Sequence, residues 1–259
     1  MNIMVFDTET TSIEKPFVYN IGWCIYNTDT KTVIHKADYV VEQVWHNKEL
    51  FTTAYYVEKR EEYIKRMRGR TCTMAKLGYI TQLMYRLIKD FEIEYAFAYN
   101  SPFDTNVFDF NCEWFKIINP FDTVKIVDIR GYAHKVVGFD PDYQAFCEKH
   151  SLFTDKGNYS STAESIYKWI SGVTEFIEEH TALADSEIEL EILRYCIEEK
   201  GLEWGKEYKV YHSIPRLVEK TLEIKDTSGV KHSFPYNSIM IYKEKADKTR
   251  IICKAKGGA

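Results

Sequence analysis

The sequence lacks a cysteine pair at metal-binding spacing, a long apolar run and any internal repeat. Its six cysteines are scattered, and no C-x-x-C pair occurs among them, so neither a zinc site nor a disulfide framework is predicted. A reducing, cytoplasmic location is therefore expected. No apolar run reaches the ~18 residues of a membrane span, and the start "MNIMVFD" lacks the basic region of a secretory signal.

The chain also lacks an overall basic charge, since its net charge is −5. From Gly205 to the end, however, it has twelve Lys/Arg and six Asp/Glu, a local balance of +6, and the remaining chain carries −11. A basic tail on an acidic body fits a protein that holds polyanions with one part and metal ions with another. A solvated hairpin rich in lysine gives the same pattern.

The 259 residues, 45% of them hydrophobic, suffice for one large domain with a small appendage. Apolar runs over 2–7, 17–28 and 32–44 predict a three-strand meander, and 94–100 and the start of 124–134 predict two more strands. Helical patterns follow over about 46–67 and 74–91, from 101, and over most of 141–200. This order predicts an α/β domain over 1–204 and a basic, strand-rich extension over 205–259.

Two carboxylates, Asp7 and Glu9, stand at the end of the first predicted strand, in "VFDTETT". Residues i and i+2 of a strand point to the same side, so these two like charges share a face and repel one another. A divalent cation with a preference for oxygen ligands removes that repulsion. Taken alone, the pair fits a hydrated surface turn better than a metal site.

Two further acids stand on predicted apolar helix faces. Asp104, in "YNSPFD", has Val107 and Phe108 as its helical neighbours, although with Ser101 as N-cap it also fits a capping box. Asp185, in "HTALADSEIELEIL", has Ile188 at helical spacing. An unpaired charge on a buried stripe is costly, which favours a ligand role for both acids.

His180 precedes Asp185 by five residues. A lone histidine usually packs in a core or meets solvent. Near clustered acids it is also suited to act as a general base, since its pKa lies near neutrality and adjacent carboxylates tend to raise it.

These three motifs, in this order, resemble those of the DEDDh 3′–5′ exonucleases, the DnaQ-like family with a ribonuclease-H-like fold. "FDTETT" is similar to the first motif, "AYNSPFD" to the second and "HTALAD" to the third, whose spacing matches the histidine subclass. The resemblance spans residues 1 to about 200. It departs from the family at Ser12, where glycine is frequent, in the long stretch between Glu9 and Asp104, and in the tail from about 205.

The resemblance implies a mixed five-stranded sheet flanked by helices, with the "DTET" strand central. It implies that Asp7, Glu9, Asp104 and Asp185 bind two Mg²⁺ or Mn²⁺ ions, that His180 accepts a proton from the attacking water, and that 5′-nucleotide monophosphates leave a 3′ end. Candidates for holding the terminal nucleotide are Thr8, Thr10, Asn100 and Phe103; Phe103 is equally suited to the core.

The segment 59–70 adds six Lys/Arg residues and Tyr63, which suit phosphate tracking and base stacking. Its interleaved glutamates also fit a solvated helix. The leading hypothesis is an exonuclease acting on single-stranded DNA 3′ ends, with no membrane partner. The alternatives are an RNA-directed enzyme of the same fold, as in the oligoribonuclease and ribonuclease T branches, and a non-catalytic nucleic-acid-binding module.

Overall fold

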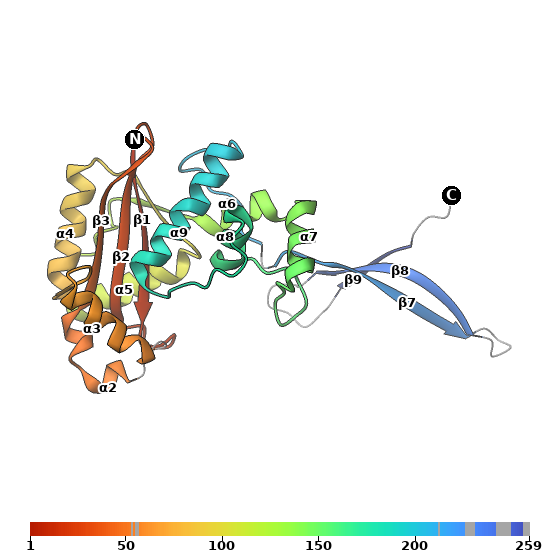
Figure 1. The fold of residues 1–259 in the computed structure, drawn as a ribbon, viewed down its shortest axis with the longest axis horizontal. Helices are drawn as coiled ribbons and strands as arrows, with labels where there is room; N and C mark the ends of the chain where they lie inside the picture. Colours follow the sequence, from red (N-terminus) through yellow and green to blue (C-terminus); the bar gives the residue numbers. More distant parts are fainter. Residues whose placement is uncertain (53, 55–56, 212, 226–230, 242–249, 256–259) are drawn as a thin grey trace.

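The computed structural model describes residues 1–259 except 53, 55–56, 212, 226–230, 242–249 and 256–259, and it describes side chains up to residue 216. A six-stranded sheet of order β4-β3-β2-β1-β5-β6 forms the centre of the body (Figure 1). The pairs β1–β2 and β2–β3 are antiparallel, and the other three are parallel. The strands are β1 (Asn2–Thr10), β2 (Val18–Asn27), β3 (Thr32–Val41), β4 (Thr73–Ala75), β5 (Tyr95–Ala98) and β6 (Lys125–Asp128).

Helices cover both faces of this mixed sheet, which confirms the predicted α/β class. One core lies between the sheet and the helices α3 (Arg60–Arg68), α4 (Leu77–Asp90) and α5 (Pro102–Phe115). The other lies beneath α6 (Ile129–Val137), α7 (Pro141–His150), α8 (Ala163–Ser171) and α9 (Ala182–Arg194). None of the helices in the described part of the chain has the length and apolar character that a bilayer crossing requires.

Strand β1 is buried on both sides. Ile3 and Val5 belong to the core beneath α9, and Met4 and Phe6 belong to the opposite core. The sequence predicts that the first strand ends at residue 7, with the two acids of "DTE" at its end. The strand instead continues to Thr10, so both acids lie within it. They share the face of Ile3 and Val5 because residues two apart point to the same side. The parallel neighbour β5 pairs only with Ile3–Val5, so the acids lie where β1 extends past it.

Several predicted elements differ in detail. The sheet has six strands because the short β4 adds to β3 at the start of the predicted helix 74–91. The predicted helix 46–67 is divided into α2 (Lys48–Phe51), the 3₁₀ turn η1 (Val57–Lys59) and α3, and the short helix α1 (Glu42–Trp45) replaces the end of the predicted strand 32–44. Pro102 occupies the first helical position of α5, as predicted, but Ser101 makes no cap bond because its own φ of −48° and ψ of −26° are already helical.

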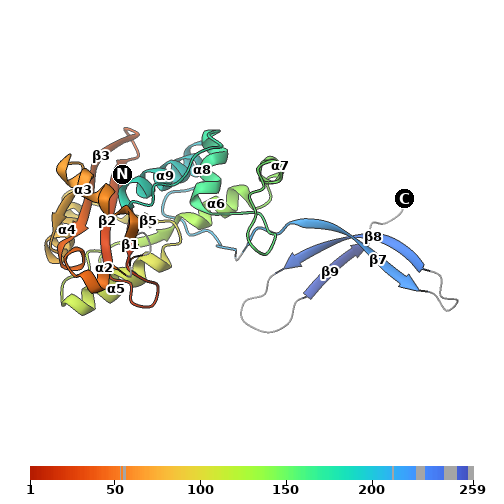
Figure 2. The same ribbon diagram turned by 60° about the horizontal axis from the view of Figure 1, so that its bottom comes forward.

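The C-terminal part first returns along the body and then leaves it. The ring of Tyr208 packs edge-on against Tyr132 at 4.8 Å, and the N–H of Tyr159 donates to the carbonyl of Ile214 (3.1 Å). A separate antiparallel sheet, β7 (Leu217–Lys225), β8 (Lys231–Ile241) and β9 (Arg250–Ala255), then extends away from the body (Figures 1 and 2). The division of the chain into domains at 204/205 stays a prediction.

His134 joins this returning segment to α6. Its ring is fully buried, and its Nδ1 accepts a hydrogen bond from the N–H of Tyr211 (3.0 Å). Burial, and then the charge of Arg130, lower the pKa of His134 to about 4. Between pH 6.5 and 4 the unfolded chain therefore binds a proton that the folded chain does not, so stability falls as the pH falls through this window.

We expect this one group to cost up to about 3 kcal/mol of stability by pH 4. The variant His134→Asn keeps an acceptor for the Tyr211 N–H but has no proton to take up. Urea midpoints measured between pH 7 and 4.5 should therefore fall less steeply for His134→Asn than for the wild type. The exposed His46, replaced by asparagine, serves as the control. Parallel pH profiles for wild type and His134→Asn would contradict the assignment.

Candidate active site

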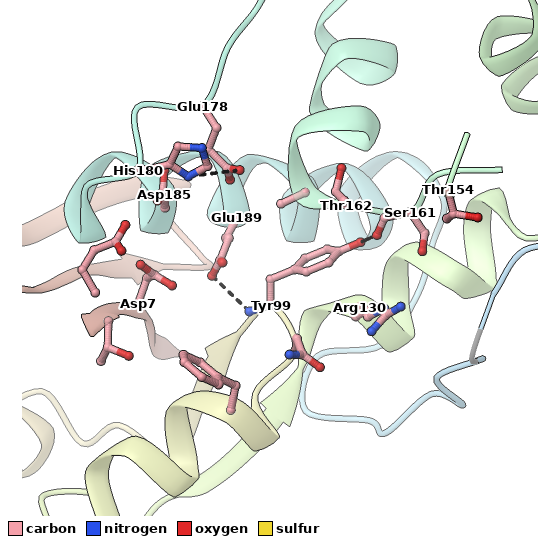
Figure 3. Close-up of a pocket in the computed structure, with 15 residues that line it drawn as sticks. Asp7, Tyr99, Arg130, Thr154, Ser161, Thr162, Glu178, His180, Asp185 and Glu189 are labelled. Carbon is pink, nitrogen blue, oxygen red and sulfur yellow. Dashed lines mark hydrogen bonds and ion pairs between the residues drawn. The ribbon is translucent and has the colours of Figure 1, made fainter. Parts of the chain in front are cut away.

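A pocket of about 530 Å³ opens where β1 extends past β5 (Figure 3). It is lined by four of the five predicted catalytic residues, Asp7, Glu9, His180 and Asp185. Strand β1 supplies the first two, and α9 with the turn before it supplies the others. One side-chain atom each from Glu9, His180 and Asp185 lies within 4.8 Å of the other two. Segments more than 170 residues apart in the chain thus place their polar groups at one point.

Asp104 lies behind the pocket wall, in the first turn of α5, and is 2% exposed. Its Oδ1 accepts a hydrogen bond from the hydroxyl of Thr8 (2.6 Å), which fixes the carboxylate next to β1. Burial raises the pKa of Asp104 to about 7, although the Thr8 hydroxyl lowers it. Thr8 therefore orients an acid. It also lines the pocket, and its predicted role toward a substrate stays a prediction.

The carboxyls of this cluster all bind protons more tightly than free acids do. Burial, and then the charge of Asp104, raise the pKa of Asp7, while burial and then Asp185 raise that of Glu9. Burial, and then Glu178, raise the pKa of Asp185 to about 8. Its Oδ1 is buried without a hydrogen-bond partner among the described residues. A cluster of this kind has strong affinity for positive charge, which protons satisfy only in part.

Two further acids line the same pocket and were not predicted from the sequence. Glu189 is buried one helical turn after Asp185 on α9, and its Oε2 accepts from the N–H of Tyr99 (3.1 Å). Glu178 lies two residues before His180, and burial raises its pKa to about 7. The i, i+4 spacing of Asp185 and Glu189 is a signal that the sequence does contain, because two acids at that spacing share one helix face.

His180 has a backbone φ of +49°, which is uncommon for a residue with a side chain. Its Nδ1 lies 3.9 Å from the Glu178 carboxylate, and the carbonyl of the preceding Glu179 accepts a hydrogen bond from Lys59. Burial and then Lys59 lower the pKa of His180, and they outweigh the acids Glu164 and Glu58, which raise it as the sequence predicts. The imidazole is therefore neutral at neutral pH and able to accept a proton.

The first turn of α9 is held by a buried hydrogen-bond network centred on Asn20. The Oδ1 of this fully buried side chain accepts from the N–H of Ala182 and from the hydroxyl of Tyr63 (both 2.8 Å). Its Nδ2 donates to Asp38 (2.6 Å), which in turn receives a bond from Arg66 (2.7 Å). Asn20 thus caps α9 in place of Thr181, whose side chain makes no cap bond.

This network also bears on the predictions for the segment 59–70. Tyr63 is fully buried, so the predicted role in base stacking is wrong. Arg66 pairs with Asp38, and Arg60 lies over the ring of Trp45 at 5.0 Å, so both contribute to packing of the body. Lys65, Arg68 and Arg70 are exposed, and the role of this segment in tracking phosphates stays a prediction.

The remaining predicted residues are placed as follows. Asn100 and Phe103 line the pocket, whereas Thr10 is buried and does not. Asn100 has a φ of +62°, and its N–H donates to Oδ1 of Asp128 (2.9 Å), which holds the turn between β5 and α5. Their roles toward a substrate stay predictions.

The donor set fits a divalent cation with a preference for oxygen. Hard ions such as Mg²⁺ and Mn²⁺ bind carboxylates, and Asp185, one oxygen of which has no hydrogen-bond partner among the described residues, lines the same pocket as Asp7 and Glu9. Binding of such an ion would lower the raised pKa values, because positive charge favours the ionised carboxylates. The acids on this pocket are therefore suited to hold metal ions and, through them, a phosphate group.

No protein-family model matches the chain, and neither does any curated protein sequence. Several solved structures, by contrast, are similar to the chain. The nuclease domain of 3′hExo, described as a DEDDh family member bound to rAMP, is 12% identical with a TM-score of 0.52, over 82% of this chain and 96% of that domain. A 3′-exonuclease that recognises the 3′ end of a histone mRNA stem-loop is 13% identical with a TM-score of 0.48, over 98% and 74%.

E. coli exonuclease I in complex with a dA16 oligonucleotide is also similar, at 14% identity and a TM-score of 0.43, over 75% of this chain and 40% of that one. At these identities the likeness to 3′hExo shows the fold. The chain has the ribonuclease-H-like fold of a DEDDh nuclease domain, which confirms the fold that the three sequence motifs predict.

Proposed function

We propose that this chain, with the fold of a DEDDh nuclease domain, is a metal-dependent 3′–5′ exonuclease that releases 5′-nucleotide monophosphates from single-stranded DNA. The observation that supports the proposal is the group of buried acids, Asp7, Glu9, Asp104 and Asp185, beside a neutral His180. A protein fold tolerates so many buried carboxylates with raised pKa values chiefly where a cation is bound.

In the proposed mechanism, Asp7, Glu9, Asp104 and Asp185 would hold two divalent ions, and these would supply positive charge at the scissile phosphate and a lower pKa for the attacking water. His180 accepts the proton of that water, which its lowered pKa permits at neutral pH. Thr8 keeps Asp104 oriented through their hydrogen bond. Asn100 and Phe103, on the pocket wall, contact the terminal nucleotide.

The decisive test is digestion of 5′-labelled single-stranded oligonucleotides with Mg²⁺ or Mn²⁺. We expect a ladder that shortens from the 3′ end, with mononucleotides as products and no cleavage in EDTA. An oligonucleotide with a blocked 3′ end should remain intact. Full-length substrate after incubation with either metal would refute the proposal, and salt-dependent binding without turnover would indicate a non-catalytic module.

RNA is the second candidate substrate. The structural neighbour with a TM-score of 0.52 is described with rAMP bound, and rAMP is a ribonucleotide. A mixture of DNA and RNA oligonucleotides of one sequence, labelled with different dyes, measures the ratio of kcat/KM values directly. Faster loss of the RNA would reverse the proposed preference without affecting the proposed chemistry.

Replacement of His180 by alanine is expected to lower kcat by about 10²- to 10⁴-fold, the usual contribution of a general base. The acids remain in place, so Mg²⁺ should still raise the melting temperature of the variant. Wild-type kcat should fall as the pH drops below the lowered pKa of the imidazole, and the residual activity of His180→Ala should lack this dependence. A wild-type pH profile with the same acid limb as that of His180→Ala would argue against the assignment.

A further inference from the structure

The end of the pocket opposite the acid cluster is basic and rich in hydroxyl groups. It contains Arg130, in the first turn of α6, and the hydroxyl groups of Thr154, Ser161 and Thr162 (Figure 3). The buried Nε of Arg130 has no hydrogen-bond partner among the described residues. A guanidinium donor removed from water without an acceptor is costly, which indicates that a ligand completes the site.

Internal partners for Arg130 are largely occupied. The charge of Asp128 interacts with that of Arg130, but its Oδ1 already accepts from the backbone N–H groups of Asn100 and Arg130 (both 2.9 Å), and the Nε of Arg130 makes no hydrogen bond to it. This arrangement caps α6 and fixes the turn at Asn100. The guanidinium is thus attached to the first turn of a nine-residue helix, and the dipole of that helix favours an anion at the same point.

Tyr99 connects the two ends of the pocket. Its backbone N–H donates to Glu189 on the acidic side, while its hydroxyl donates to the carbonyl of Ser161 (2.6 Å) on the side of Arg130 (Figure 3). The ring therefore forms a fixed wall between a cation-binding end and an anion-binding end. A nucleic-acid strand with one phosphate at the cation-binding end would place its next phosphate along this wall.

We infer that Arg130 binds the phosphodiester one nucleotide upstream of the scissile bond and so fixes the register of the strand. This inference rests on the proposed function, because the acidic end must hold the scissile phosphate. Arginine suits this role, since its planar group offers two parallel donors to phosphate oxygens. The hydroxyl group of Ser161 provides a further donor on the same wall, whereas that of Thr162 already donates to Ser165 (2.9 Å). Arg130 thereby favours oligonucleotides over mononucleotide esters.

The test compares two substrates that differ in the upstream phosphate. For Arg130→Gln we expect kcat/KM on a single-stranded oligonucleotide to fall about ten- to a hundredfold, mainly through KM. Hydrolysis of the p-nitrophenyl ester of thymidine 5′-monophosphate, which has no upstream phosphate, should stay within twofold of wild type. Arg130→Lys should recover part of the loss, and Lys135→Gln, which removes an exposed charge from the same helix, should behave as wild type.

A methylphosphonate at the upstream position removes the charge from the substrate instead. With the methylphosphonate substrate, kcat/KM of the wild type should fall by the same factor by which Arg130→Gln lowers it on the normal oligonucleotide. The kcat/KM of Arg130→Gln should be the same on the two oligonucleotides. If Arg130→Gln lost equal activity on the normal oligonucleotide and on the p-nitrophenyl ester, its role would be merely structural. No loss on either of these two substrates would refute the inference. Failure of wild type to hydrolyse any substrate would refute the proposed function instead.

Binding provides an independent measurement. The anisotropy of a labelled oligonucleotide, titrated with protein at several salt concentrations, gives a slope of log K against log salt. One phosphate contact contributes about 0.7 to this slope for a single strand. We expect the slope for Arg130→Gln to be smaller by about that amount, and an unchanged slope would refute the contact even in an inactive protein.

Discussion

Replacement of Asp185 by asparagine is expected to reduce cleavage strongly and, at the same time, to stabilise the metal-free protein. The pKa of this carboxyl is raised to about 8, against an ordinary value near 3.8, because burial and Glu178 disfavour its charge. The folded state therefore holds a proton that the unfolded chain has released. The contribution of this carboxyl to the free energy of unfolding therefore falls as the pH rises from about 4 to 8. Asparagine has the same shape and no charge, so it removes this loss.

Two measurements separate the effects. Cleavage by Asp185→Asn should fall by about 10²- to 10³-fold or more, as when a key electrostatic contact to a transition state is lost. Its melting temperature in EDTA at pH 8 should rise by about 2–4 °C for each kcal/mol gained. Mn²⁺ should raise the melting temperature of wild type through preferential binding to the folded state, and that of Asp185→Asn much less.

The exposed Glu187, also on α9, provides the matched control. Glu187→Gln removes a carboxylate from the same helix and breaks a surface pair with Lys36 (2.8 Å). Such pairs contribute little, so activity and the metal-dependent shift should both persist. Asp185→Asn with substantial cleavage, or with an unchanged response to Mn²⁺, would show that Asp185 is not part of a metal site.

The sequence predicts the elements that carry the acids because each is marked by a local conflict. Asp7 and Glu9 interrupt an apolar strand, and Asp104 and Asp185 stand on apolar helix faces. Charges at such positions are expensive unless they have a function, so the three motifs remain visible without any structure. Helical and strand periods also place most elements within a few residues of their observed ends.

Other features depend on contacts between distant segments and leave no local trace. Tyr63 appears as an aromatic residue among charges in the sequence, yet it is fully buried against Asn20 of β2. The lowered pKa of His180 depends on burial and on Lys59, 121 residues earlier in the chain. The short β4 forms only because β3 offers it an open edge. Only the folded chain brings these groups together.

Gly22 is one such position, and its replacement by alanine is the second large effect that we expect. This glycine in β2 is paired with Asp7 of β1. A Cβ atom there would lie 2.1 Å from the backbone nitrogen of Leu183 in the first turn of α9. The carbonyl of Gly22 also accepts a hydrogen bond from Ser186 (3.1 Å). Backbone atoms cannot rotate away, so α9 must shift from the sheet and take Asp185 and His180 with it.

Displacement of catalytic groups by about 1 Å can reduce the rate by about 10²-fold. We therefore expect kcat/KM of Gly22→Ala to fall by at least that factor, with a loss of stability of about 1–3 kcal/mol from overpacking. Metal-dependent stabilisation should weaken as well, because the acids of β1 and α9 separate. Activity assays, urea unfolding and melting temperatures with and without Mn²⁺ measure the three effects on one preparation.

Gly78, in the first turn of α4, is the matched control. An added Cβ there would meet only the side chain of Ile117, at 3.4 Å, and alanine is the better helix former. Gly78→Ala should therefore keep full activity and equal or greater stability. The two variants make the same chemical change, so a difference between them isolates the close approach of α9 to β2. Wild-type activity in Gly22→Ala would show that the position of α9 on β2 does not determine the geometry of the site.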